Sequence, residues 1–402
     1  MKSQIVSTIA CALIVWIGPQ ASAASPLKVF ILAGQSNMQG HAQVRTLEHL
    51  GMDPQTAPLL KMLRSADGTP IVCQHVWISS IGHDGSEQER HGQLTVGYGA
   101  AGRDVKIGPE LMFGVTMQQL VGEPILIIKT AWGGKSLHTD FRPPSAGPYK
   151  FNEKQLAQLE SQGKDIKQEV AARTEASGKY YRLMTDHVRT VLSDLKRVCP
   201  DYDVDAGYEL AGFVWFQGWN DMVDQGVYPQ RDQIGGYGDY STLLAQFIRD
   251  VRRDLDTPNL PFVIGVMGVG GPTSEYDASQ QRYKAIHQNF RDAMAAPASL
   301  VEFQGNVAAV FTEKCWDLQL GELSQRWGKV QSKTRELNQD KSLSAQEREA
   351  QLANYRAEHF TPEELRIYEV GKSNAEFHYL GSGKIMVQIG KAFAETLAAM
   401  HK

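Results

Sequence analysis

Ser36 comes shortly after an apolar stretch, behind Gly34 and Gln35, in the segment VFILAGQSNMQGHA (residues 29–42). A serine hydroxyl is a weak nucleophile, so it needs a base within hydrogen-bond reach and donors for the oxyanion that forms. A strand that ends on a small residue and then a hydroxyl is one way to present such a nucleophile. A serine that only caps the next turn has the same local pattern, so the choice depends on the rest of the chain.

Two later clusters contain groups that could donate to an oxyanion. Gly133 and Gly134, in KTAWGGKSL, would allow a backbone N–H to approach a developing negative charge closely. Gln217, in VWFQGWND, could donate from its side-chain amide. The structural alternatives are a plain tight turn for the glycines and a buried amide satisfied by backbone for the glutamine.

A candidate base comes late in the chain. His378 is one of eleven histidines and stands in SNAEFHYLGSGK, just before the last predicted helix. Loops at such junctions often carry catalytic bases. A solvent-exposed histidine at the start of a helix is the alternative, and the three other clusters favour the catalytic interpretation.

Apolar runs predict the elements that would position these residues. Four runs have the length and β-branched content of buried parallel strands, and amphipathic segments lie between them. Strands that alternate with helices predict an α/β fold with a central parallel sheet. The carboxyl ends of such strands share one edge, where ligands bind. The predicted strands are 27–34, 123–131, 211–218 and 260–268, and the predicted helices are 108–121, 180–198, 240–255 and 381–400.

Two polar stretches interrupt this alternation, near residues 141–179 and 319–369. Both are charged and poor in large apolar residues, so neither could bury a core of its own. We interpret them as helical insertions at the rim of one domain, residues 24–402. Residues 1–23 are typical of a signal peptide, with Lys2, a short apolar run and a small-residue cleavage site. They predict a secreted or periplasmic protein.

Composition excludes several classes of function. A formal net charge of −4 gives no electrostatic case for nucleic acid or for an anionic membrane as a partner. Cysteine and histidine spacing predicts no metal site, and no phosphate-binding loop is evident, so no cofactor is expected. After export three cysteines would remain, Cys73, Cys199 and Cys315, and their pairing stays open.

The blocks GQSNM, WGGKS, WFQGWND and FHYLGSGK together resemble those of SGNH (GDSL-like) hydrolases. More narrowly, they are similar to the carbohydrate esterase family 6 and sialate O-acetylesterase branch. The resemblance implies a three-layer, flavodoxin-like α/β/α fold and hydrolysis of acetyl esters on carbohydrates without a metal. It implies Ser36 as nucleophile and His378 as base. The Ser36 N–H, the Gly134 N–H and the Gln217 amide would hold the oxyanion.

Two positions depart from the family pattern. Trp219 stands where relatives usually have Glu, and Ala375 stands where they have the Asp that orients the histidine. Glu376 would share the side of His378 in an extended segment, so it is the predicted replacement acid. The alternatives are that Glu376 only stabilises a helix start, or that a backbone carbonyl or a remote acid such as Asp317 orients the ring.

The sequence therefore predicts an exported carbohydrate O-acetylesterase, with Trp132, His138 and Trp219 lining the sugar site. A non-catalytic carbohydrate-binding protein on a decayed esterase scaffold is the alternative, because the orienting Asp is missing. Another esterase or a transferase that uses the same serine also stays open. The acetylated glycan, whether xylan, sialic acid or another, and the oligomeric state are not determined.

Overall fold

The structure, a computed structural model, describes residues 25–401, so the predicted signal peptide lies outside the described residues. Its centre is a seven-stranded sheet in the order β4-β3-β6-β1-β7-β8-β9. All pairs in the sheet are parallel except β3–β4 at one edge. The strands of this sheet are β1 (Leu27–Gly34), β3 (Val76–Ile81), β4 (Arg90–Gln93), β6 (Ile125–Ala131), β7 (Tyr208–Phe216), β8 (Phe262–Val266) and β9 (Val307–Phe311). A separate antiparallel pair is formed by β2 (Ala42–Gln43) and β5 (Lys106–Ile107).

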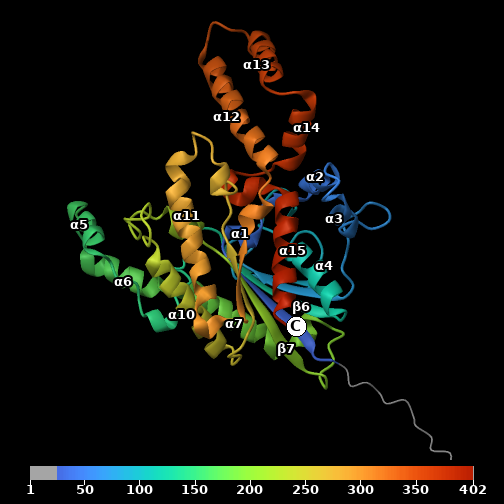
Figure 1. Ribbon diagram of the computed structural model, residues 1–402, viewed down its shortest axis with the longest axis vertical. Coiled ribbons are helices and arrows are strands. Elements are labelled where there is room, and N and C mark those ends of the chain that lie inside the picture. The colour runs from blue at the N-terminus through green and yellow to red at the C-terminus, as the bar shows by residue number, and fades with distance from the viewer. Residues whose placement is uncertain (1–24, 402) are drawn as a thin grey trace, which may run out of the picture.

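Helices cover both faces of this sheet (Figure 1). The α-helices are α1 (Ser36–Gln39), α2 (Glu48–Gly51), α3 (Ala57–Met62), α4 (Glu110–Val121), α5 (Glu153–Ser161), α6 (Ile166–Ala176), α7 (Lys179–Ser193), α8 (Leu195–Val198), α9 (Trp219–Val223), α10 (Gly238–Asp254), α11 (Gln281–Ala295), α12 (Leu318–Gln339), α13 (Ala345–His359), α14 (Pro362–Gly371) and α15 (Gly383–Ala399). The 3₁₀ helices are η1 (Val44–Leu47), η2 (Pro144–Ala146), η3 (Thr273–Glu275), η4 (Ala296–Ser299), η5 (Val301–Phe303), η6 (Thr312–Cys315) and η7 (Glu376–Gly381).

Alternation along β7 shows how the layers are held together. Phe213 and Trp215 contact Phe247 of α10 on one face of the sheet. Phe216 contacts Phe393 of α15 on the other face. Successive strand residues point to opposite faces, so a strand covered on both sides is apolar throughout. This arrangement confirms the predicted three-layer α/β/α fold with a central parallel sheet.

The strand order places β1 at the centre, between β6 and β7. In flavodoxin the first strand lies instead between the second and third, so the layers are shared but the order is not. From β1 the chain first adds strands on the β6 side and then on the β7 side. Such a switch in direction opens a crevice at the carboxyl ends of the central strands.

Helices also form in both polar stretches. In Figure 1, α5 and α6 extend as an arm, and α12 and α13 project as a hairpin beyond the sheet. Neither α5, α6 nor α13 contains a buried residue. Their ends are stabilised locally instead, by side-chain caps from Asn152, Asp165 and Ser344. No helix among residues 25–401 is long and apolar enough to cross a membrane.

Candidate functional site

Ser36 begins α1 at the carboxyl end of the central strand β1. The turn before it is very tight, since a Cβ on Gly34 would lie 2.1 Å from the Phe216 carbonyl oxygen. The serine is 8 % exposed, and its hydroxyl donates no hydrogen bond to a residue that the structure describes. The end of β1 therefore presents a hydroxyl that is free to react.

A buried ion pair between Lys129 and Glu110 helps to fix the position of α1. The Lys129 ammonium, at the end of β6, lies 2.7 Å from Glu110 Oε2 and also donates to the Gln39 carbonyl oxygen at 2.9 Å. Both charged side chains are almost fully buried. The Gln39 amide donates in turn to the carbonyl oxygens of Gly82 and His83. The last residue of α1 is thus held by two neighbouring segments, which fixes the position of Ser36.

The segment that carries His378 packs against α1. The His41 ring, five residues after Ser36, stacks on the His378 ring with centroids 3.8 Å apart and planes within 3°. The Gln43 N–H donates to Ser373 Oγ, and Arg45 donates to the carbonyl oxygens of Glu369 and Lys372. The structure therefore brings the predicted nucleophile and base to the same edge of the sheet, without a direct hydrogen bond between them.

A strained turn follows His378. Tyr379 and Leu380 both have positive φ, 51° and 61°, in the left-handed region that L-residues seldom adopt. The Tyr379 hydroxyl compensates, because it accepts from the Gly268 N–H and pairs with Thr312 Oγ1 beyond the ends of β8 and β9. Strain of this kind persists where the surroundings over-determine the backbone. Here the hydrogen bonds of the Tyr379 hydroxyl hold the strained His378 loop over the sheet.

The expectation that Glu376 orients His378 is wrong in this geometry. The group at His378 Nδ1 is Asn374 Oδ1, at 3.0 Å, and no hydrogen bond or ion pair joins Glu376 to His378. Residues from 376 onward form η7 and are not extended. The backbone of His378 itself, with a φ of −104° and a ψ of 33°, is not extended, so the alternation of sides that the prediction assumed does not apply. Asp317 is also occupied elsewhere, since it caps α12 and pairs with Lys384.

Burial and charge keep the His378 ring neutral. Its pKa is lowered to about 4, chiefly by burial and then by the positive charge of Lys106. The pKa of His41 is lowered further, to about 3, by burial and then by His378 and the nearby lysines. Both rings are therefore neutral at neutral pH, and a neutral imidazole is the form that can accept a proton.

Gly133 and Gly134 follow β6 beside Ser36. A Cβ on Gly133 would lie 3.8 Å from Ser36 Cβ, whereas a Cβ on Gly134 would meet nothing within 4 Å. Gly134 has a φ of 75°, which favours glycine. Neither N–H donates to a described residue. The unpaired Gly133 N–H thus belongs to a residue next to the serine, and the unpaired Gly134 N–H follows it in the chain.

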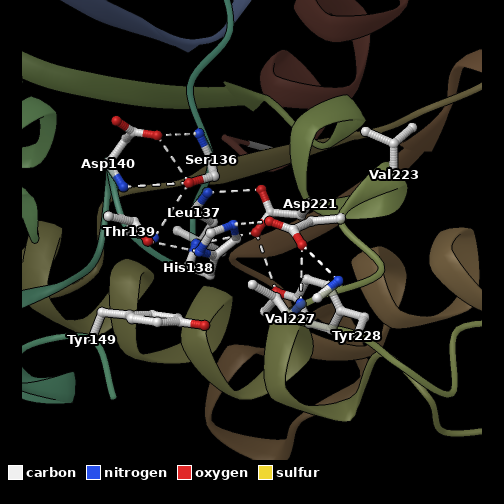
Figure 2. Close-up of polar contacts among 12 residues, drawn as sticks. Ser136, Leu137, His138, Thr139, Asp140, Tyr149, Asp221, Val223, Val227 and Tyr228 are labelled. Atoms are coloured by element: carbon white, nitrogen blue, oxygen red, sulfur yellow. Dashed lines mark hydrogen bonds and ion pairs between the residues drawn. The ribbon is translucent and has the colours of Figure 1, made fainter. Parts of the chain in front are cut away.

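Contrary to expectation, the Gln217 side chain has no free amide hydrogen to donate to an oxyanion at Ser36. Its Nε2 donates to the Lys135 carbonyl oxygen at 3.0 Å and to Asp221 Oδ2 at 2.6 Å, so both amide hydrogens are used. Asp221 is fully buried and also accepts from the N–H groups of Leu137 and His138 and from the Tyr228 hydroxyl (Figure 2). Burial raises the pKa of Asp221. Gln217 therefore joins the loop after β6 to α9.

We expect Gln217→Ala to act on stability. The substitution leaves buried Asp221 without one donor, which costs about 1–3 kcal/mol of unfolding free energy. Urea denaturation measures this, and Gln331→Ala, an exposed position on α12, is the control with a change within about 0.5 kcal/mol. A hundredfold loss of kcat at unchanged stability would instead restore Gln217 as an oxyanion donor.

The three predicted sugar-contacting residues lie in different places. Trp132 is 1 % exposed and packs on Phe141 and Tyr180, so it belongs to the core. His138 pairs with Thr139 and Asp224 (Figure 2) and lines a cavity of about 410 Å³ that includes neither Ser36 nor His378. Neither side chain lines the cavity beside the His378 loop to which Trp219 contributes.

Trp219 alone of the three lies next to the His378 loop. Its ring is 5.6 Å from that of Phe377, which in turn lies 4.4 Å from the His378 ring. Trp219 and Phe377 line a cavity of about 590 Å³, which we call the aromatic pocket. Its other lining residues include Arg231, Tyr276, Tyr283 and Glu376. Ser36 and His378 do not line this pocket either, but Phe377 both lines it and contacts the His378 ring.

Some features of the site have no signal in the sequence. Asn374, His41 and the pair of Lys129 with Glu110 were not predicted, because their roles depend on contacts between distant segments. Among residues 25–401, no cluster of three or more histidine, cysteine or acidic side chains could hold a metal ion. Within the same range Cys73, Cys199 and Cys315 form no disulfide.

Comparisons with known proteins place the chain in a family. No curated protein sequence matches it. Among solved structures, a protein from Arabidopsis thaliana is 15% identical, with 93% of this chain and 98% of that chain covered and a TM-score of 0.38. A carbohydrate acetylesterase from Xanthomonas citri is 13% identical, with 70% and 49% covered and a TM-score of 0.37. Neither likeness is strong enough to inform activity.

The family model gives a clear result. Residues 26–307 match the carbohydrate esterase family described as sialic acid-specific acetylesterase. This range contains Ser36, Gly134 and Gln217, whereas His378 lies beyond it. Since the match spans more than half of the chain, the protein belongs to this carbohydrate esterase family.

Proposed function

We propose that this protein is an exported serine esterase that removes acetyl groups from an acetylated carbohydrate such as xylan or a sialic acid-containing glycan. The observation that carries the proposal is the meeting of Ser36 and the His378 loop at the carboxyl end of β1. Family membership supports the reaction class. Export stays a prediction from residues 1–23.

The proposed reaction uses a serine and a histidine. Ser36 Oγ attacks the acetyl carbonyl carbon while His378 Nε2 takes the hydroxyl proton. The tetrahedral intermediate collapses, and His378 returns the proton to the departing sugar oxygen. Water then attacks the acetyl-enzyme by the same route, which releases acetate and restores Ser36. His378 is an imidazolium in each tetrahedral intermediate and is neutral again when acylation and deacylation are complete.

Backbone donors would stabilise the oxyanion. The N–H groups of Ser36 and Gly134 are the donors that the sequence predicts, and we add the Gly133 N–H because a Cβ on Gly133 would lie 3.8 Å from Ser36 Cβ. Such preorganised donors act where negative charge develops and are worth more in a site with little water. Gln217 is not part of this set, since its amide hydrogens are already bonded.

The aromatic pocket is the proposed site for the sugar. Trp219 and Phe377 offer faces on which the C–H groups of a sugar ring can pack. The structure differs here from the expectation for Trp132 and His138, so Trp219 keeps its proposed role alone.

Acetate release tests the proposal directly. The protein should release acetate from p-nitrophenyl acetate and from at least one of acetylated xylan and acetylated sialic acid, and activity should fall from acetyl to octanoyl esters. The Ser36→Ala variant is the negative control for each substrate. Binding of these glycans without acetate release would instead support the non-catalytic alternative, and faster octanoyl hydrolysis would identify a lipid esterase.

The pH dependence of kcat/KM provides a separate prediction. The neutral His378 ring is the active form, so activity is lost as pH falls through its pKa. Because burial and Lys106 lower that pKa to about 4, the acid limb should lie near pH 4, below the ordinary histidine value of about 6.5. An acid limb at pH 6 or above would contradict this environment for His378.

A further inference from the structure

Three contacts fix the His378 ring. Asn374 Oδ1 lies 3.0 Å from Nδ1, the His41 ring covers one face at 3.8 Å, and the Phe377 ring meets it edge-on at 4.4 Å. The stack defines the plane of the imidazole, and the Asn374 contact defines its rotation within that plane. No carboxylate pairs with His378 among the described residues.

A neighbouring hydrogen bond identifies the tautomer. The Ala375 N–H donates to Asn374 Oδ1 at 2.7 Å, so this atom of the amide must be the oxygen and not the nitrogen. An oxygen facing Nδ1 requires a hydrogen on Nδ1. The lone pair is then on Nε2, which is the arrangement that a general base needs.

We propose that Asn374 and His41 are positioning residues that together replace the orienting carboxylate of His378. Asn374 selects the tautomer and the rotation, and His41 holds the plane of the ring and shields one face from water. This inference rests on the proposed Ser36–His378 mechanism. It assigns to Asn374, four residues before the histidine, the work that relatives give to the residue at position 375.

A site in which Asn374 orients His378 differs in charge from a site in which a carboxylate does so. The groups that face His378 are His41 after α1 and, at longer range, Lys106 of β5, while Glu376 lies on its own element. Lys129 of β6 acts on His41. A neutral amide adds no negative charge, so the imidazole gives up its proton readily and stays available as a base in acid. The imidazolium formed on attack retains the Asn374 hydrogen bond, which becomes charge-assisted.

Substitutions at Asn374 separate the hydrogen bond from charge. Asn374→Ala removes the acceptor, and kcat should fall about 10- to 100-fold with KM within about twofold, the usual range for a hydrogen bond to a charged group. Asn374→Asp keeps the acceptor and adds a negative charge. It should retain activity at pH 8 and move the acid limb of kcat/KM upward by about 1–3 units. An Asn374→Ala variant equal to wild type would overturn the assignment, as would an Asn374→Asp variant with an unmoved acid limb.

Substitutions at His41 separate ring shape from ring chemistry. His41→Phe keeps a flat ring and should stay within about threefold of wild type in kcat, whereas His41→Ala should lose about tenfold. His359→Ala is the matched control, because His359 also stacks on a ring, that of Tyr355, but on the projecting hairpin. It should leave kcat and the acid limb unchanged. Equal activity of His41→Ala and wild type would remove His41 from the proposal.

A spectroscopic measurement tests the tautomer without relying on activity. In ¹⁵N-histidine-labelled protein, the resonance lost in His378→Gln should report an Nδ1–H, Nε2-unprotonated ring above pH 5, and Asn374→Ala should mix the two tautomers. An Nε2–H ring in the wild type would contradict the inference. If Ser36→Ala is inactive while the Asn374 and His41 variants match wild type, the inference fails and the proposed function stands. If Ser36→Ala keeps wild-type activity, the proposed function fails.

Discussion

Replacing Ser36 by alanine should lower kcat for acetate release by roughly 10⁴- to 10⁶-fold, the size of effect seen when a serine hydrolase loses its nucleophile. No other hydroxyl begins a helix at the end of the central strand, within the part of the chain that the structure describes. The side chain is small and donates no hydrogen bond, so its loss should leave the fold intact. Steady-state hydrolysis of p-nitrophenyl acetate measures the effect.

Two controls make this result interpretable. Ser274→Ala removes an exposed serine from η3, beyond the end of β8, and should leave kcat unchanged. Urea denaturation should give Ser36→Ala the same unfolding free energy as wild type within about 0.5 kcal/mol. A folded Ser36→Ala protein with more than a tenth of wild-type activity would show that another group attacks the ester.

Replacing Lys129 by methionine should destabilise the protein by about 3–5 kcal/mol, because it leaves the Glu110 carboxylate buried and unpaired. Glu110 would retain only the Gly108 N–H as a donor. The Gln39 carbonyl oxygen would lose its ammonium donor as well, so α1 and Ser36 should shift. We therefore expect reduced kcat in the protein that remains folded.

A double variant distinguishes pairing from packing. Lys129→Met with Glu110→Met removes both charges and should recover at least half of the lost stability, since an apolar pair in a buried site is often as stable as the ion pair. Lys391→Met is the matched control on α15, where Lys391 pairs with Glu395 at the surface. It should cost less than about 1 kcal/mol. A Lys129→Met cost as small as this control would contradict the buried ion pair.

Periodicity in the sequence located most of the sheet. The four apolar runs became β1, β6, β7 and β8, because a strand covered on both faces must be apolar along its whole length. Three strands of the same sheet were missed, and one of them is the short, polar edge strand β4, RHGQ. β3, VWISSI, carries two buried serines, and β9, VAAVF, is short and rich in alanine. Neither has the continuous bulky apolar character on which the prediction depended.

The site, too, has features that the sequence predicts and features that it does not. The sequence by itself determined that Ser36 and the Gly133–Gly134 pair lie at one edge, because parallel strands end together, whereas the packing of η7 against α1 brings the His378 loop there. Only the tertiary structure decided what each side chain contacts there. Gln217 and Trp132 lie at the ends of predicted strands, yet Gln217 is bonded to Asp221 and Trp132 is buried in the core. Asn374 reaches His378 because a strained 3₁₀ turn replaces an extended segment, and His41 reaches it from a part of the chain more than three hundred residues away. Hydrophobic pattern fixes which segments are buried, whereas a hydrogen-bond partner depends on ångström-level placement of segments that only packing brings together.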